Sequence, residues 1–419
     1  MLEAIEKKAA ADGTDFWFER WGEVLKPSDW PFLPAHPELA GGFRRESDIL
    51  DVWLDSGVSW LSVLGENAVA DLYLEGSDQH RGWFQSSLVM STAIRGKAPY
   101  KAVLTHGFVL DEKGRAMHKS TGNVVAPQEV IGKLGADLLR LWVSLCDYSD
   151  DVRISDNLLK GPEDSYRRVR NTFKYLLGAL DGFDDKQKIA YGDLPEMERY
   201  LLHRLAAVQL ATLEDYRAYR YRDAARRLVD FCAFDLSSFY LDGIKDRLYT
   251  FKLGSPERLV AQTVMSEVLA RLCALLSPIL SFTAEEAWRF WPAKPAESVF
   301  LWDLPAPEGR WTDDALAARW DKARELRERV LKKLEEARTA KLIGKSLDAK
   351  VVLPGDAAAF KGLNLEELFI VSQVEWGTGS DIAVAHADGA KCPRCWRWQT
   401  DLGSNAQFPE LCGRCARQL

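Results

Sequence analysis

The sequence predicts a multidomain protein: an α/β unit with a parallel sheet, an all-helical domain, and a small α+β carboxyl-terminal domain with a zinc ribbon. Three observations support this prediction. The chain has 419 residues, more than one hydrophobic core usually organises. Apolar runs alternate with helical patterns only between residues 48 and 148. Four of the seven cysteines fall in the last 28 residues.

The composition excludes several classes of protein. With 47% hydrophobic and 28% charged residues, the chain has the balance of a folded soluble protein, not of a disordered or collagen-like one. The net charge of −7 excludes a histone-like polycation but permits basic faces on single domains. There is no uninterrupted apolar run of about 18 residues, and the cysteine pattern is not that of a disulfide scaffold. We therefore expect a cytoplasmic protein without a membrane partner.

The amino-terminal part of the chain shows the α/β pattern. Residues 16–42 begin with an aromatic-rich stretch and continue with closely spaced prolines and glycines, which predicts a short helix and then an irregular connection. Beyond residue 48 we expect strands at 71–75 and 102–110 and helices at 79–95 and 135–145. Strands that alternate with helices are typical of a parallel sheet.

The rest of the chain is predicted to be mainly helical. Helical spacing dominates from residue 149 to 281. A later helix places apolar residues at steps of three and four between Trp320 and Ala337, and we expect it to end at Gly344. A short strand over 347–353 follows, and the small polar residues 381–389 predict a linker.

Four cysteines near the carboxyl terminus form a zinc-binding pattern. Cys392 and Cys395 make one C-x2-C pair, and Cys412 and Cys415 make a second pair sixteen residues later. Two such knuckles place four thiolates around one Zn²⁺, and a segment this short has too small a core to fold without the metal. Independent buried cysteine pairs or a redox dithiol are the alternatives. The tryptophans and arginines around the cysteines permit contact with nucleic acid.

A predicted strand-to-helix corner is a candidate ligand site. Glu75 ends the strand, Gly76 makes the turn, and Ser77 or Asp78 caps the next helix. Ligands of open α/β sheets bind at the carboxyl ends of strands. Glu75 and Asp78 are suited to hold an ammonium group or a ribose. The alternative is that Asp78 only caps the helix and His80 lies on its surface.

The loop over residues 112–123 is a candidate phosphate site. It follows a predicted strand, contains glycines, and carries Arg115, Lys119 and Ser120. Cations and hydroxyls on such a loop can close over a polyphosphate and stabilise the charge that develops as pyrophosphate leaves. A solvated basic turn is the alternative, and composition alone favours it.

Several segments occur in an order that resembles one family. In chain order they are residues 48–57, 74–85, 106–108 and 117–123, followed by the four cysteines. Together they resemble the carboxyl-terminal portion of bacterial isoleucyl-tRNA synthetases, which are class I aminoacyl-tRNA synthetases. Residues 167–172 and 343–349 are similar to the same family. Synthetases for valine and leucine differ at positions 55–57 and 76–79, which favours the isoleucine family.

The resemblance implies an ATP-dependent ligase that activates isoleucine as the adenylate and transfers it to tRNA(Ile). It implies Zn²⁺ as cofactor, ATP with Mg²⁺ as substrate, and a monomer in the full-length family. Lys119 stabilises the phosphates in this interpretation. The implied site residues are Glu75, Gly76, Asp78 and Gln79 for the aminoacyl-adenylate, His106, Gly107, Phe108, Met117 and Lys119 for ATP, and His118, Lys119 and Ser120 for catalysis.

The sequence departs from the family pattern in two ways. The signature loop is usually Lys-Met-Ser-Lys-Ser, whereas here Ala116 replaces the first lysine and His118 the first serine. The loop thus has one cation fewer, for which Arg115 is a partial substitute. The His-Ile-Gly-His motif and the inserted editing domain are both missing from the sequence. We therefore expect a fragment or split-gene half that needs a separate amino-terminal half for activity.

The resemblance also implies domain boundaries. Residues 1–47 correspond to the segment that follows the editing domain in the family. The remaining regions are 48–148, the second half of a Rossmann-like catalytic domain with the signature loop; 149–305, a helical anticodon-binding domain; 306–385, a carboxyl-terminal junction domain; and 386–419, a zinc-binding module.

Two basic stretches of the helical domain are candidate RNA surfaces, residues 157–174 and 217–227. Cations follow RNA phosphates, and aromatic faces accept unstacked bases. Solvated helix faces with ion pairs are the alternative. Trp288, Trp291 and Trp302 are expected in the core or at a domain junction. The candidate tRNA-binding residues are Arg167, Arg168, Arg170 and Asn171.

Two other functions are compatible with some of these motifs. A stand-alone tRNA-binding zinc protein without ligase activity needs only the helical domain and the ribbon. A synthetase for another branched-chain amino acid shares the signature loop. The order of the catalytic motifs favours an isoleucine–tRNA ligase fragment over both.

Overall fold

The computed structural model describes residues 2–19, 46–355, 360 and 362–419, and the chain divides into two units, 1–106 and 107–419. The short helix predicted after Phe16 is confirmed, and the connection predicted beyond it falls mainly on residues 20–45, outside the described residues. The described elements of the first unit are α1 (Leu2–Asp12), α2 (Phe16–Glu19), α4 (Val52–Gly57), α5 (Ser59–Leu64), β1 (Ala70–Gly76), the 3₁₀ turn η3 (Ser77–Arg81), α6 (Trp83–Arg95) and β2 (Tyr100–His106).

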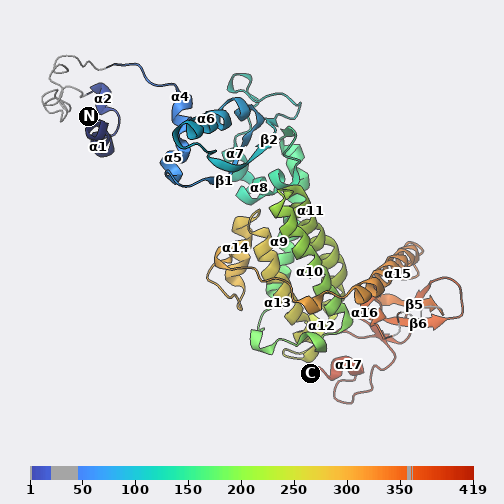
Figure 1. The fold of residues 1–419 in the computed structure, drawn as a ribbon. Helices are drawn as coiled ribbons and strands as arrows, with labels where there is room; N and C mark the ends of the chain where they lie inside the picture. Colours follow the sequence, from blue (N-terminus) through green and yellow to red (C-terminus); the bar gives the residue numbers. More distant parts are fainter. Residues whose placement is uncertain (1, 20–45, 356–359, 361) are drawn as a thin grey trace, which may run out of the picture. The chain divides into compact units, whose positions relative to one another are not determined.

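The first unit contains a βαβ arrangement. β1 pairs with β2 in parallel and α6 connects them, which confirms the predicted parallel sheet (Figure 1). The register places Glu75 opposite Thr105 and Gly76 opposite His106. The carboxyl ends of both strands therefore meet at one edge, which is where open α/β sheets bind ligands.

The second unit begins with a small α/β segment. The single strand predicted over 102–110 is wrong: β2 ends at His106, and the next strand pairs elsewhere, parallel to a segment at Val152. The backbone N–H of Gly107 donates to Tyr148 O at 2.8 Å, which fixes the start of this segment. Its elements are β3 (Val109–Leu110), the 3₁₀ turn η4 (Lys119–Thr121), α7 (Pro127–Leu134), α8 (Ala136–Leu145) and β4 (Val152–Arg153).

A helical region follows, as predicted. Figure 1 shows α9, α10, α11 and α13 side by side, and their facing surfaces form the main core. Trp288 and Trp291 are buried and Trp302 packs against Trp288, so these rings are core residues as expected. The elements are α9 (Asp156–Ala179), α10 (Glu196–Arg217), α11 (Tyr221–Asp230), the π-helical segment η7 (Phe231–Leu241), α12 (Lys245–Thr250), α13 (Pro256–Leu276) and α14 (Ser281–Phe290).

One helix of this region, α13, is long and apolar enough to cross a membrane. Its most apolar window has a mean hydropathy of 1.6, but 83% of that window is buried inside the protein. It packs against α9, α10 and α14. A helix that is apolar on all sides is expected at the centre of a helical core, and α13 is such a core helix.

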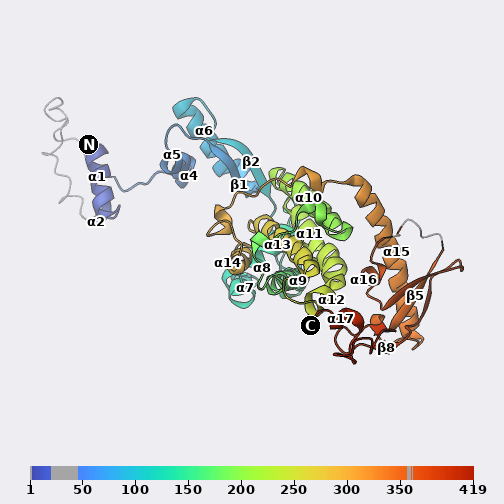
Figure 2. The same ribbon diagram turned by 90° about the horizontal axis from the view of Figure 1, so that it is seen from below.

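The carboxyl-terminal region packs a small sheet against a long helix. The strand β5 lies between β6, to which it is parallel, and β7, to which it is antiparallel. Figure 2 shows α15 beside this sheet. The elements are α15 (Asp314–Thr339), β5 (Ala349–Pro354), α16 (Leu365–Phe369), β6 (Gln373–Gly377), β7 (Ala383–His386), β8 (Ala390–Lys391), β9 (Trp398–Gln399) and α17 (Gly413–Ala416).

Two predictions for this region are wrong. The helix α15 ends at Thr339 and not at Gly344, because Lys341 adopts a φ of 59° and the N–H of Leu342 donates to Ala337 O, which closes the helix. Residues 381–389 are not a linker, because β7 lies within this stretch and pairs with β5. Ile382 and Val384 pack against the main core, and two apolar side chains among small residues were too weak a signal to predict a strand.

A buried ion-pair group joins the helical region to the carboxyl-terminal region. Arg247 on α12 contacts Glu198 of α10 at 3.0 Å and both carboxylate oxygens of Glu367 on α16 at 3.0 and 2.9 Å. The hydroxyl of Tyr240 also donates to Glu198. Glu198 is fully buried, and burial raises the pKa of its carboxyl group. Such charges remain tolerable only while every partner is present.

We expect Arg247→Met to lower the free energy of unfolding by about 3–5 kcal/mol, because it leaves two buried carboxylates without a cation. Urea unfolding followed by tryptophan fluorescence measures the change. Lys245→Met on the same helix is the control, because its ion pair with Asp242 is exposed and is worth at most about 1 kcal/mol. Equal losses in the two variants would contradict a special role for the buried group.

Candidate functional site

Three predicted site residues meet at the ends of β1 and β2. Glu75 Oε1 accepts a hydrogen bond from the Gly76 N–H at 3.0 Å and lies 3.7 Å from Nε2 of His106. Both side chains are about half exposed, with relative accessibilities of 52% for Glu75 and 40% for His106. A carboxylate and an imidazole that are open to solvent can accept hydrogen bonds from an ammonium group or a ribose.

The turn after β1 differs from the prediction in its capping residue. Neither Ser77 nor Asp78 caps the next helix. Instead, Gln79 Oε1 accepts from the N–H of Trp83 at 2.9 Å, at the start of α6. The Gln79 amide also donates to Asp78 Oδ2 at 3.0 Å. Gln79 is thus held in place, and its amide orients the Asp78 carboxylate, which remains exposed.

The packing beneath this corner uses residues that sequence reasoning did not single out. A Cβ on Gly82 would lie 2.8 Å from the Trp53 ring, so the contact of α4 with the start of α6 requires glycine. The Trp83 indole N–H lies 3.1 Å from both Ser56 O and Ser59 Oγ, which it can reach as a shared donor. The motif at residues 48–57 therefore shapes the corner by packing. The sequence signal that could have predicted this packing is the Gly-Trp pair inside the motif at 74–85.

Two residues predicted to bind ATP, Gly107 and Phe108, stand at the start of the second unit. A Cβ on Gly107 would lie 2.3 Å from the Asp150 carbonyl, so the backbone passes there only as glycine. The Phe108 N–H donates to Asp151 Oδ1 at 2.7 Å, while its side chain is 48% exposed. An exposed aromatic ring on a fixed backbone is a suitable surface for a purine.

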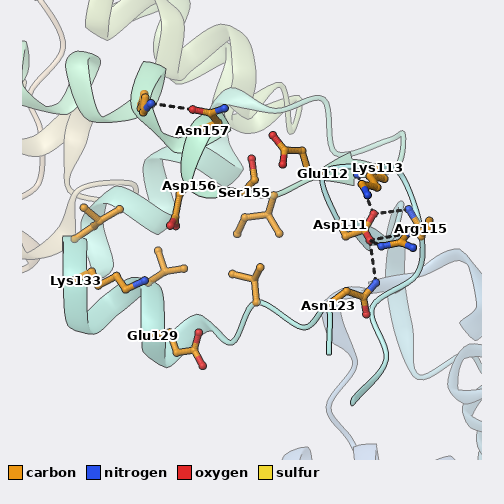
Figure 3. A pocket seen from close by; sticks show the side chains of 15 residues that line it. Asp111, Glu112, Lys113, Arg115, Asn123, Glu129, Lys133, Ser155, Asp156 and Asn157 are labelled. Atoms are coloured by element: carbon orange, nitrogen blue, oxygen red, sulfur yellow. Dashed lines mark hydrogen bonds and ion pairs between the residues drawn. The ribbon is translucent and has the colours of Figure 1, made fainter. Parts of the chain in front are cut away.

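The base of the predicted phosphate loop is held by one carboxylate. Asp111 Oδ1 accepts from the backbone N–H groups of Lys113 at 3.0 Å and Arg115 at 2.8 Å, and Oδ2 pairs with the Arg115 guanidinium (Figure 3). Hydrogen bonds from Asn123 and Arg115 lower the pKa of Asp111 well below its usual range. These residues form one wall of a cavity of about 610 Å³.

Asn123 closes the loop from its other end. Its amide donates to Asp111 Oδ2 and to Ala116 O, each at 3.0 Å, and its Oδ1 accepts from the His118 N–H at 2.9 Å. The Thr121 hydroxyl also contacts Asn123 Oδ1. Sequence reasoning singled out neither Asp111 nor Asn123, because both resemble ordinary turn residues until their contacts are known.

The predicted catalytic residues lie on the outer part of this loop. His118, Lys119 and Ser120 are exposed, and Lys119 has no ion-pair partner among the described residues. Met117, in contrast, is partly buried. Its sulfur accepts from the Val125 N–H at 3.5 Å, and its side chain packs against a small buried cluster. Arg115 pairs with Asp111 at the base of the loop, while 63% of its side chain remains exposed, and its role as a partial substitute for the missing lysine stays a prediction.

The predicted tRNA-binding residues lie on α9. Arg167, Arg170 and Asn171 share one face of the helix with Lys174, whereas Arg168 projects about 100° from Arg167. Arg167 pairs with Asp164, and Arg170 lies over the Tyr166 ring at 5.9 Å and 3.8 Å from Glu286. Asn171 and Lys174 both line two cavities, of about 380 and 640 Å³.

The second basic stretch is engaged in internal ion pairs. Arg220 and Arg227 both pair with Asp215, which is buried, and Arg222 lies 3.5 Å from Asp147. These arginines hold α10, α11 and the preceding α/β segment together. The alternative given for this stretch, helix faces with ion pairs, therefore describes it better than an RNA surface.

The four cysteines of the carboxyl-terminal pattern are brought together. All four are buried, and their sulfur atoms lie within 4.8 Å of one another. The sulfurs of Cys395 and Cys412 are 3.9 Å apart, close to the ~3.8 Å edge of a tetrahedron with ~2.3 Å Zn–S bonds. Hydrogen bonding with Cys415 lowers the pKa of Cys395 to about 5. The donor set and its geometry fit a closed structural Zn²⁺ site.

The arginines of this module contact the helical region. Arg414 forms an ion pair with Asp246 on α12, and Arg397 lies 3.4 Å from the same carboxylate. Arg394 donates to Thr250 O at 3.0 Å. Trp396 remains 59% exposed and has a φ of 62°, a conformation that is costly for a bulky residue. The basic residues therefore dock the module, and Trp396 is its exposed aromatic side chain.

Comparisons with known proteins match three separate parts of the chain. Residues 15–155 match the model for tRNA synthetases class I (I, L, M and V), residues 198–353 the anticodon-binding domain of tRNA ligase, and residues 389–418 the zinc finger found in FPG and IleRS. The chain is 46% identical over 433 residues to isoleucine–tRNA ligase of Exiguobacterium sibiricum, covering 99% of this chain and 47% of that protein.

A second relative and a solved structure extend the comparison. Isoleucine–tRNA ligase of Carboxydothermus hydrogenoformans is 46% identical over 445 residues, covering 100% of this chain and 48% of that protein. The solved structure is that of the LeuRS of Agrobacterium radiobacter K84, in a ternary complex with tRNA and LeuAMS. It matches with a TM-score of 0.52 and 19% sequence identity, and the match covers 64% of this chain and 34% of that chain. The chain thus spans about half the length of the relatives it matches.

We expect Cys392→Ser to release the metal, because three thiolates and a hydroxyl bind Zn²⁺ more weakly than four thiolates. The zinc content, measured by atomic emission, should fall from about one per chain to near zero. The exposed Trp396 should report the loosened module by fluorescence, while the far-ultraviolet helical signal stays unchanged. Cys232→Ser, at a buried core cysteine, is the control that should retain the metal. Full zinc content in Cys392→Ser would contradict the four-thiolate site.

Proposed function

This chain is homologous to the carboxyl-terminal part of bacterial isoleucine–tRNA ligases, and from this premise we propose that it supplies the second half of the ligase active site and the tRNA-binding part of the enzyme. The reaction joins isoleucine to ATP, releases pyrophosphate, and passes the acyl group from the adenylate to tRNA(Ile). The observation that carries the proposal is the presence of the strand-end corner, the signature loop and the zinc site in one chain. The remaining strands of the nucleotide-binding sheet come from another part of the enzyme, in the same polypeptide or in a separate amino-terminal half.

The strand-end corner binds the aminoacyl-adenylate in this proposal. Glu75 and Asp78 are exposed carboxylates suited to an ammonium group and a ribose. Gly76 is buried and its N–H holds the Glu75 carboxylate, and Gln79 orients Asp78 through its amide. His106 adds a polar group beside Glu75.

The loop and the start of the second unit bind ATP and stabilise the departing pyrophosphate. Gly107 and Phe108 border the adenosine, with the exposed Phe108 ring as the stacking surface. Met117 anchors the loop through its packing contacts. Lys119 supplies the cation, with His118 and Ser120 as hydrogen-bonding neighbours, and ATP enters with Mg²⁺.

The tRNA follows the exposed face of α9. The proposed contacts are Arg167, Arg168, Arg170 and Asn171. Of the two cavities that Asn171 and Lys174 line, the one of about 640 Å³ is also lined by Tyr249. Tyr249 in turn lines a cavity of about 470 Å³ together with Trp396. Tyr249 is 71% exposed and Trp396 59%, so both rings can accept unstacked bases between the cations.

A stand-alone zinc protein without ligase activity is not favoured. The match to the class I synthetase model spans residues 15–155, which such a protein does not need. We further propose that the enzyme is cytoplasmic and monomeric.

We expect Lys119→Ala to lower isoleucine-dependent pyrophosphate exchange by about 10²- to 10³-fold, as loss of one charge-stabilising group does in other enzymes. The assay uses the chain combined with the amino-terminal half of a homologous ligase. The affinity for tRNA should stay the same, because Lys119 is not among the proposed tRNA contacts. Lys133→Ala is the control for loss of a lysine. Unchanged exchange in Lys119→Ala would remove this residue from catalysis.

We expect Trp396→Ala to weaken binding of tRNA(Ile) by about 5- to 150-fold, equivalent to about 1–3 kcal/mol for one stacked base. Arg170→Ala should instead reduce the dependence of affinity on salt by about one phosphate contact. Filter binding across a salt series measures both effects, with a non-cognate tRNA for comparison. Lys332→Ala on the exposed side of α15 is the control for lost charge. Wild-type affinity in Trp396→Ala would exclude this ring as a base platform.

A further inference from the structure

The signature loop is closed by two residues that have no catalytic chemistry of their own. Asp111 and Asn123 stand at its two ends, and the Asn123 amide donates to Asp111 Oδ2 at 3.0 Å (Figure 3). Between them lie His118, Lys119 and Ser120, which are exposed. The contact therefore joins the two ends of the segment that carries the proposed phosphate-binding lysine.

Position 123 requires an amide. The nitrogen of Asn123 faces Asp111 Oδ2 and Ala116 O, which only accept hydrogen bonds, while its oxygen faces the His118 N–H, which only donates. A carboxylate at this position could not donate to either acceptor and would stand beside the Asp111 charge. An alkyl side chain would remove the partner of Ala116 O and of the His118 N–H, and would leave Asp111 Oδ2 with Arg115 alone.

Position 111 requires a charge in addition to hydrogen-bond acceptors. Asp111 is only 7% exposed, and its two oxygens accept from Lys113, Arg115 and Asn123. The ion pair with Arg115 holds that guanidinium at the base of the loop. Arg115 therefore has an ion-pair partner at the base of the loop, and Lys119 is the one lysine or arginine on the outer part of the loop, residues 116–122.

We propose that Asp111 and Asn123 are positioning residues that determine the position of Lys119. Asn123 fixes the backbone of His118, the residue before Lys119. Asp111 fixes Asn123 and binds Arg115 at the base of the loop. The inference rests on the proposed function for its effect on catalysis, but its structural part does not. A contact that merely stabilised the fold would affect substrate binding and turnover alike. A positioning contact lowers turnover in the ATP step and leaves the KM for isoleucine unchanged.

The test uses three variants of the whole chain: Asn123→Asp, Asp111→Asn and the double exchange of the two. Each replacement is nearly isosteric, and unchanged helical circular dichroism shows that the variants fold. The double exchange restores a donor and an acceptor between positions 111 and 123, with the direction reversed. Asn157→Ala is the matched control, because Asn157 lines the same cavity and contacts Lys160 instead of the loop.

The first readout is hydrogen exchange of the chain by itself. Asn123→Asp keeps an oxygen that could accept from the His118 N–H, but its carboxylate is repelled by Asp111 and cannot donate to Ala116 O, so the side chain should move away from this position. We therefore expect exchange of the His118 amide to become about 2- to 12-fold faster, the worth of one hydrogen bond. The second readout is pyrophosphate exchange with an added amino-terminal half. Both single variants should lower its kcat on the order of 10- to 100-fold, as misplacement of a reacting group does, without changing the KM for isoleucine. The double exchange should recover part of both losses.

The outcomes separate this inference from the proposed function. Wild-type exchange of the His118 amide in Asn123→Asp overturns the inference whether or not the enzyme is active. An active wild type with unchanged kcat in both single variants also overturns it and leaves the ligase function intact. An inactive wild type with both halves present contradicts the proposed function, while the hydrogen-exchange result still decides the role of the two residues.

Discussion

The arrangement of the second unit depends on the ion pairs that the short helix α12 makes. Its adjacent residues Asp246 and Arg247 contact different modules: Arg247 reaches buried carboxylates on α10 and α16, and Asp246 binds the arginines of the zinc module. Buried charges are tolerated only when each has its partners, so these contacts select one arrangement. The helical core, the small sheet and the zinc site are therefore fixed to one another through two neighbouring side chains.

This junction changes how the basic residues are understood. In sequence, the arginines around the cysteines and those at 217–227 look like RNA contacts, yet Arg414, Arg220 and Arg227 are paired with aspartates inside the protein. Of the candidate surfaces in the described part of the chain, the exposed face of α9 and the ring of Trp396 are those we propose for RNA contact. Zinc has a structural role here, because it holds the knuckle that presents Trp396 and the arginines that dock the module.

The two segments proposed to form the active site are stabilised by different kinds of interaction. The corner after β1 depends on close packing, with Gly82 and Trp53 in contact and no room for a side chain between them. The signature loop depends on a polar network centred on Asp111 and Asn123, which leaves its outer residues exposed. A packed corner is suited to recognising a bound adenylate, whereas a loop held mainly by hydrogen bonds, with Lys119 and Ser120 exposed, can respond to the arrival and departure of phosphates.

The sequence by itself determined the fold class, the zinc ligands and the family, because strand and helix periodicity, C-x2-C spacing and short motifs are local properties. The contact between Glu75 and His106 was decided by the tertiary structure, because β2 ends at His106 and not at Leu110 as predicted. Only the tertiary structure decided which arginines are internal, that residues 383–386 form a strand, and that Asp111 holds Arg115 at the base of the loop. Each of these depends on a partner distant in sequence or on the path of a turn, and composition and periodicity carry no information about such pairs.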